Sequence, residues 1–164
     1  MRSFVDNSGR SWSLIININA VKRIRAFYNL DILELMTVNE KTGEMNADVL
    51  ERLSNDPVLL VDVLYVVCKE EVEQRGVSEE NFGAALTGDV IEYATKQLLE
   101  EIIDFFPEAK RKMYRKALTA AYRFAENQKQ RLQEFLNDPE LENKILSELQ
   151  ILNSASSTSP ESVE

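Results

Sequence analysis

The segment DPVLLVDVLYVVC, residues 56–68, constrains the fold of this chain more than any other. Asp56 suits a helix N-cap and Pro57 suits the first helical position, so the segment predicts a helix that begins here. Its side chains are apolar nearly all round, and such a helix must be covered by other elements on most of its faces. The sequence therefore predicts a helical domain built around this helix, whose polar extension ends at Gly76.

A β-hairpin is predicted at the N-terminus. Residues 3–6 suit a short extended segment, and residues 7–9, with the letters NSG, suit a tight turn. Residues 11–18 alternate between two faces, which indicates a strand. The apolar residues expected on one face of this strand are Trp12, Leu14, Ile16 and Ile18.

Helices are predicted for most of the remaining chain. A capping residue or a proline marks the expected start of each at Asn17 or Asn19, Ser78, Asp89, Pro107 and Asp138-Pro139. The helix from Pro107 should run to about Leu136, and residues 38–46 are expected to form a loop. Apolar residues recur at helical spacing in the last two helices, at Met113, Phe124, Leu132 and Phe135 and at Leu141, Ile145, Leu149 and Leu152.

Together these patterns predict a mostly α fold. A short N-terminal β-hairpin should pack on a compact helical bundle, followed by a long C-terminal helix pair. We expect a hairpin and helical core domain over residues 1–106 and a C-terminal helical extension over residues 107–152. The polar, serine-rich residues 153–164 are expected to be a disordered tail.

The composition argues against an enzyme. The 164 residues contain no histidine, which removes the commonest general base, and a single cysteine, which excludes an internal disulfide and a cysteine-based zinc site. Neighbouring carboxylates such as Glu100 and Glu101 would point to different faces of a helix. We therefore expect no catalytic residues, no cofactor and no metal. The lack of a long apolar run or a signal-peptide pattern predicts a cytoplasmic protein.

The net charge of −9 is unevenly distributed. Residues 1–30 carry five basic side chains against one acidic one, and residues 108–131 carry eight against two. The second stretch, with Tyr114 and Tyr122 among its basic residues, could contact nucleic-acid phosphates. Alternatively, its aliphatic stems and tyrosines pack on the acidic remainder of the chain. The overall acidity favours this second interpretation.

The predicted hairpin has two possible roles that the sequence leaves open. A two-stranded hairpin alone is marginal in water, so it must pack on helices or on strands of another chain. It could therefore cover the helical core. It could equally provide an edge that pairs with a neighbouring copy or a partner peptide.

The order of these features resembles the tail assembly chaperones of tailed phages, the family of the lambda G protein. In that family a short β-element with a polar turn, a leucine and an Asn-Ala pair precedes a compact helical body with a buried Leu-Tyr helix. The resemblance covers about residues 3–106. The matching residues here are Gly9, Trp12, Leu14, Asn19, Ala20, Leu64, Tyr65, Ser78, Glu79, Glu80 and Phe82.

This resemblance implies a non-enzymatic protein that binds the tape-measure protein and helps recruit tail-tube subunits while the tail grows. Such a protein would be absent from the mature virion and could form homo-oligomers. The alternatives are a structural component of a phage tail or head–tail joint and a small nucleic-acid-binding regulator. The protein-binding residues expected are Arg10, Trp12 and Arg25 at the N-terminal surface and Leu141, Ile145 and Leu149 on the last helix.

Overall fold

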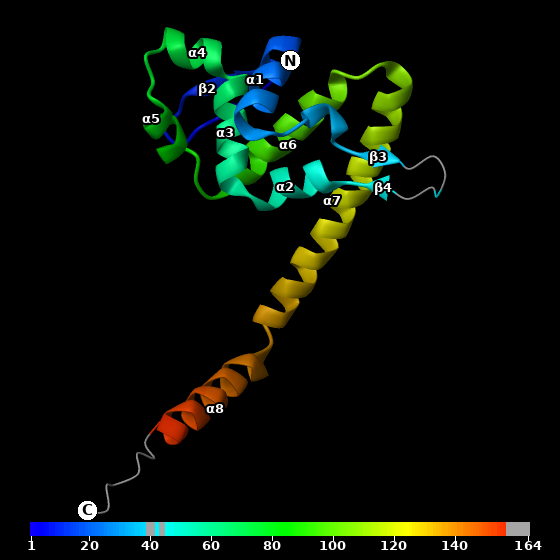
Figure 1. Cartoon of the computed structure of the whole chain (residues 1–164). Coiled ribbons are helices and arrows are strands. Elements are labelled where there is room, and N and C mark those ends of the chain that lie inside the picture. Colours follow the sequence, from blue (N-terminus) through cyan, green and yellow to red (C-terminus); the bar gives the residue numbers. More distant parts are fainter. Residues whose placement is uncertain (39–41, 43–44, 157–164) are drawn as a thin grey trace, which may run out of the picture. The chain divides into compact units, whose positions relative to one another are not determined.

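A computed structural model describes residues 1–38, 42 and 45–156 of the chain (Figure 1). The described residues are mostly helical, with a two-stranded antiparallel hairpin at the N-terminus and long helices toward the C-terminus, as expected. The chain divides into two compact units, Met1–Lys116 and Ala117–Glu164. The first unit contains the hairpin and the core helices.

The hairpin consists of β1 (Arg2–Val5) and β2 (Ser11–Leu14), with Phe4 opposite Trp12. The second strand is shorter than expected, because the chain turns into helix α1 (Ile18–Tyr28) and leaves Ile18 exposed. The Asn17 side chain accepts a hydrogen bond from the N–H of Ala20, which makes Asn17 the N-cap and ends the strand pattern early.

A second small ribbon lies within the stretch that was expected to be a loop. After the short 3-10 helix η1 (Ile32–Glu34), strand β3 (Thr37–Val38) pairs with β4 (Met45–Asn46). Residues 39–41 and 43–44 of the expected loop lie outside the described residues. Helix α2 (Asp48–Asn55) follows.

Helix α3 (Pro57–Val67) is the centre of the first unit, as its sequence predicts. The Asp56 side chain accepts hydrogen bonds from two backbone N–H groups of the first turn. Helices α1, α2 and α6 (Asp89–Asp104) all pack against α3 (Figure 1). The buried residues of α3 are Leu59, Leu60, Val63, Leu64, Val66 and Val67. The predicted helix is interrupted at Cys68, and α4 (Lys69–Gln74) continues it.

Two glycines with positive φ shape the chain around the next helices. Gly76 has φ 61° and follows α4, as its sequence position predicts. Helix α5 (Glu79–Ala84) begins after Ser78, whose side chain accepts from the N–H of Asn81. The expectation that Asp89 caps α6 is wrong: Gly88, with φ 61° and ψ −137°, occupies the cap position and Asp89 is the first helical residue.

The last two helices are long. Helix α7 (Glu108–Leu136) begins directly after Pro107, and α8 (Pro139–Ser156) begins after Asp138, whose side chain accepts from the N–H of Glu140. Helix α8 therefore includes the first four residues of the segment expected to be a disordered tail. Residues 157–164 lie outside the described part of the chain.

Candidate protein-binding surface

Trp12 lies in the core, so the expectation that it is a surface binding residue is wrong. Its exposed fraction is 0%, and its ring meets the Phe82 ring edge-on at a centroid separation of 5.1 Å. The guanidinium of Arg75 lies 4.8 Å from the Trp12 ring centroid. Trp12 and Leu14 lie on the same face of β2, and this face of the hairpin packs against the helices.

Arg10 binds the buried carboxylate of Asp6. The Arg10 Nε donates to Asp6 Oδ2 at 2.7 Å, and its Nη2 donates to the Asn81 carbonyl at 3.2 Å. The backbone N–H groups of Ser8 and Arg10 each donate to Asp6 Oδ1 at 2.9 Å, and the Trp12 Nε1 donates to Oδ2 at 2.8 Å. Arg10 therefore ties the hairpin turn together and links it to α5.

These hydrogen bonds keep Asp6 ionised. Burial raises the pKa of Asp6, but the hydrogen bonds from Trp12, Arg10 and Ser8 outweigh it, so the net pKa lies below its ordinary value. Asp6 is thus a satisfied internal anion at the base of the turn.

The outer edge of β2 is occupied by side chains of the chain itself. The N–H of Ser13 donates to Glu71 Oε2 at 3.2 Å, and the Cys68 thiol approaches the Ser13 carbonyl at 3.7 Å. Burial is the main reason that the pKa of the Cys68 thiol is raised to about 12. This edge serves the chain's own fold, which favours the hairpin as a cover over the core.

Arg25 lies beside an open hollow of about 540 Å³ at the end of α1. It forms an ion pair with Asp31, which also accepts from the N–H of Leu33. Acidic and basic side chains both line the hollow, with Asp48 and Arg52 among them. Such a mixed lining selects no particular ligand charge, and the role of Arg25 in protein binding stays a prediction.

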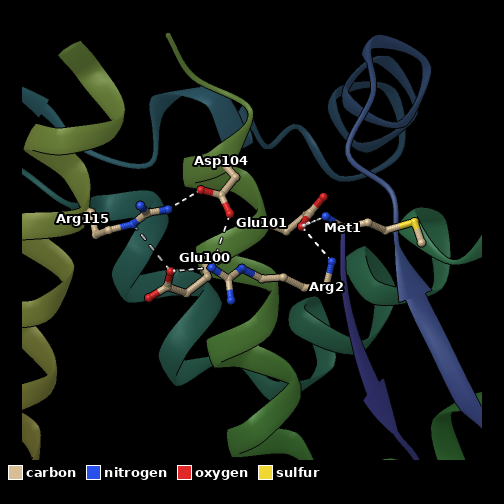
Figure 2. Close-up of polar contacts among 6 residues, drawn as sticks. All are labelled: Met1, Arg2, Glu100, Glu101, Asp104 and Arg115. Carbon is tan, nitrogen blue, oxygen red and sulfur yellow. Dashed lines mark hydrogen bonds and ion pairs between the residues drawn. The ribbon is translucent and has the colours of Figure 1, made fainter. Parts of the chain in front are cut away.

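A network of ion pairs fixes the N-terminus to α6 (Figure 2). The Arg2 guanidinium lies 3.0 Å from Glu100 and 3.3 Å from Asp104, and the N–H of Arg2 donates to Glu101 at 2.9 Å. Arg115 on α7 pairs with the same two carboxylates, Glu100 and Asp104. Two guanidinium groups therefore share two carboxylates across three elements.

The first turns of α7 pack as the second interpretation of the basic stretch proposes. Tyr114 is buried, and its ring meets the Phe106 ring edge-on at 4.9 Å. Arg115 is engaged by the acidic residues of α6, and Lys112 pairs with Glu108 on α7 itself. These side chains serve the fold, which weakens the case for phosphate recognition at this part of the helix.

Asp62 on α3 and Tyr28 on α1 are two partly buried groups whose ionised forms are disfavoured. Burial raises the pKa of Asp62, and the nearby carboxylates of Glu79 and Asp56 raise it further. Burial also raises the pKa of Tyr28, with additional contributions from Asp62 and Glu79. The ionised form of Asp62 is therefore penalised in the folded protein.

Helix α8 presents the three apolar residues expected to bind a partner. Leu141, Ile145 and Leu149 follow one another at four-residue steps and so share a face. Leu141 is partly buried, whereas Ile145 and Leu149 are 49% and 51% exposed. Leu146 next to this stripe is exposed to a similar extent.

The C-terminal half of α7 exposes a larger set of apolar side chains that the sequence does not single out as a site. Each of them has more than half of its surface exposed, and several such residues on one helix mark a candidate interaction surface. They are Phe124, Leu132, Phe135 and Leu136. Helical spacing identifies an apolar stripe here, but spacing alone does not tell whether the chain covers it.

Comparison with known proteins adds no relative: no family model, curated protein or solved structure matches the chain. Among the described residues, no group of histidine, cysteine, aspartate or glutamate side chains is arranged to hold a metal ion. In the same part of the chain, none of the helices combines the length and apolarity that crossing a membrane requires. The functional argument therefore depends on the exposed apolar surface.

Proposed function

We propose that this chain is a non-enzymatic protein-binding protein that engages a helical partner through α7 and α8. The observation that carries this proposal is the row of large apolar side chains, from Phe124 to Leu149, that remains half exposed beyond the first compact unit. Amphipathic helices of this kind bind other helices by burying their apolar faces.

The partner that best suits this surface is the coiled-coil tape-measure protein of a tailed phage. In this proposal the chain is a tail assembly chaperone in the host cytoplasm, which covers the tape-measure protein and helps recruit tail-tube subunits. Two features support it: the resemblance of residues 3–106 to that family, and two amphipathic helices whose length suits a long helical partner.

A structural component of the tail or of the head–tail joint could use the same surface, and mass spectrometry of purified particles separates the two roles. A chaperone is absent from the finished particle, whereas a structural component is present. A nucleic-acid-binding role has less support, because Tyr114 and Arg115 are engaged within the chain.

The direct test is co-expression with the coiled-coil tape-measure protein that this proposal names as the partner, followed by a solubility and pull-down assay. The proposal expects that partner to become soluble and to co-purify. The double variant Ile145→Asp/Leu149→Asp should lose it, whereas the charge-matched control Asn143→Asp/Gln150→Asp, on the opposite face of α8, should retain it. A folded chain that leaves the partner insoluble and unbound would overturn the proposal.

A further inference from the structure

One face of α7 has the spacing of a coiled-coil seam. Tyr114 and Leu118 on this face are buried, with exposed fractions of 4% and 1%. The same face continues toward the C-terminus at alternating steps of four and three residues, which is the spacing of a and d positions. The residues of this exposed part, here called the α7 seam, are Ala121, Ala125, Gln128, Leu132 and Phe135.

The α7 seam has basic residues on both flanks. Lys129 and Arg131 occupy the positions that lie on either side of an a/d stripe. The two acidic residues of this half, Glu126 and Glu134, lie farther from the seam, at b and c positions. A helix that covers the seam should therefore carry acidic residues beside its own apolar stripe.

Helix α8 has those properties. Its stripe of Leu141, Ile145 and Leu149 is exposed over most of its length, and Glu148 lies directly beside this stripe. The helix as a whole is acidic, with three glutamates against one lysine. Its 18 residues span about 27 Å at 1.5 Å per residue, which is long enough to cover the α7 seam from Ala121 to Phe135. The apolar stripe and the length of α8 thus match those of the seam, and its net negative charge complements the basic flanks of the seam.

The junction between the two helices opposes a fold-back of α8 onto its own α7. Only Asn137 and Asp138 separate the helices. The N–H of Asn137 donates to the Gln133 carbonyl at 3.0 Å, the N–H of Asp138 to Phe135 at 3.2 Å, and the N–H of Leu141 to Asp138 at 3.0 Å. Reversing the chain within these two residues would break hydrogen bonds of the junction.

We propose that the α7 seam of one copy of this chain is covered by α8 of a second copy, and the reverse. The exchange is reciprocal, so it closes into a two-fold dimer with an apolar centre and complementary charges at its flanks. This inference does not depend on the proposed function. It describes the chain on its own, and a helical partner that binds the same residues would displace α8.

The first test is site-specific disulfide formation in the full chain. Leu132→Cys and Ile145→Cys are made as separate variants of different tag length and co-expressed, then purified and oxidised. The native Cys68 is buried with a pKa of about 12, so it should not compete. The proposal expects a disulfide between the two variants, and a control pair with Gln130→Cys on the outer face should give little.

Each alternative occupant gives a different product. A dominant disulfide between two Leu132→Cys chains would show that two α7 seams pair with each other. An internal disulfide in the double variant Leu132→Cys/Ile145→Cys, with monomer mobility, would show that α8 folds back on its own helix. Either product, or no disulfide, overturns the inference. A monomeric chain that still binds the coiled-coil partner would leave the proposed function standing.

The second test is the charge pattern, measured by sedimentation equilibrium. Lys129→Glu/Arg131→Glu should weaken dimerisation by about tenfold or more, because four flanking contacts are reversed in the dimer. Adding Glu148→Lys, which lies directly beside the α8 stripe, in the same chain should restore part of it, whereas Arg123→Glu, on the outer face of α7, should change little. A full chain that sediments as a monomer at high micromolar concentration contradicts the proposal. So does a charge-reversed α7 whose dimerisation is not restored by the compensating change on α8.

Discussion

Asp6 is the one carboxylate of the hairpin, residues 2–14. It accepts from two backbone N–H groups, the Arg10 guanidinium and the Trp12 indole. We expect Asp6→Asn to lower the free energy of unfolding at pH 7 by about 2 kcal/mol, because charged hydrogen bonds are lost while their donors stay buried. Urea denaturation measures this loss. An unchanged midpoint would show that the network contributes little.

The pH dependence of this effect has a defined sign. The folded pKa of Asp6 lies below the unfolded value of 3.8, so its contribution is present at neutral pH and is lost as the pH falls through the folded pKa. The difference in stability between the wild type and Asp6→Asn should therefore shrink below about pH 4.

Asp62 should behave in the opposite way. Its pKa is raised by burial and then by Glu79 and Asp56, so its ionised form opposes folding at neutral pH. Asp62→Asn should raise the free energy of unfolding at pH 7 by less than about 1 kcal/mol, since the site is partly solvated. Urea denaturation measures this gain. The gain should disappear below the ordinary aspartate pKa. A loss of stability at pH 7 would mean that Asp62 makes a favourable interaction.

Gly88 provides a test of backbone geometry. Its φ of 61° and ψ of −137° suit glycine, and a Cβ would meet no atom within 4 Å, so the cost of Gly88→Ala is conformational. We expect a loss of about 1 to 3 kcal/mol in thermal or urea unfolding.

The matched control for this substitution is Gly83→Ala within α5. A Cβ at that position would make an ordinary 3.6 Å contact with Val61 and would favour the helix, so Gly83→Ala should be neutral or slightly stabilising. Equal losses at both positions would contradict the argument.

Residue-level expectations succeeded where the physical cause was local. Asn17, Asp56 and Ser78 accept backbone hydrogen bonds as helix caps, because a cap depends on atoms within three residues. Trp12 was misplaced at the surface because strand alternation defines two faces without telling which one packs on helices. Asp89 missed the cap position because Gly88 can adopt a backbone conformation closed to other residues.

At the scale of elements, the start of α7 is held by a specific ion-pair network. Arg115 pairs with Asp104 and Glu100, both of which also bind Arg2 (Figure 2). Arg115→Ala should speed amide hydrogen exchange over residues 108–116 while changing global stability by less than about 1 kcal/mol. High salt should produce part of the same effect in the wild type.

The control for Arg115→Ala is Lys112→Ala on the same helix. Lys112 and Glu108 are both mostly exposed, and their ion pair joins neighbouring turns of α7 alone. Its removal should leave hydrogen exchange over residues 108–116 nearly unchanged. Similar exchange in both variants would show that packing of Tyr114, rather than the network, holds the start of α7.

Elements were predictable in proportion to their length. The buried helix α3 and the long helices α7 and α8 carry periodic apolar residues and start signals, so they appear where the sequence places them. The strands β3 and β4 are too short to show a period, and their stretch was expected to be a loop. Their pairing depends on the partner strand rather than on either segment.

At the scale of the whole molecule, the first compact unit should fold without the second. It contains the hairpin, α3 and the aromatic cluster of Trp12, Phe82 and Tyr65. We expect a chain truncated after Ala121, which keeps the buried Leu118, to unfold cooperatively, with a thermal midpoint within a few degrees of that of the full chain, as followed by circular dichroism. A broad or absent transition would show that residues beyond Ala121 are needed for the first unit to fold.

The candidate surface was only partly predictable at this scale. The stripe of Leu141, Ile145 and Leu149 followed from helical spacing, because a four-residue step places side chains on one face. The exposure of Phe124 and Leu132 could not be derived in that way. Whether an apolar stripe is covered depends on which distant elements pack on it, and local periodicity carries no information about that.

The position of Trp12 gives the molecule a built-in optical reporter. Trp12 is the only tryptophan, and its indole is enclosed by Phe82, Arg75 and the Asp6 carboxylate. Its emission should shift to the red when the hairpin leaves the helices and water reaches the ring. Ligands that occupy α7 and α8 should leave this emission unchanged. Fluorescence can therefore separate undocking of the hairpin from binding at the C-terminal helices within one titration.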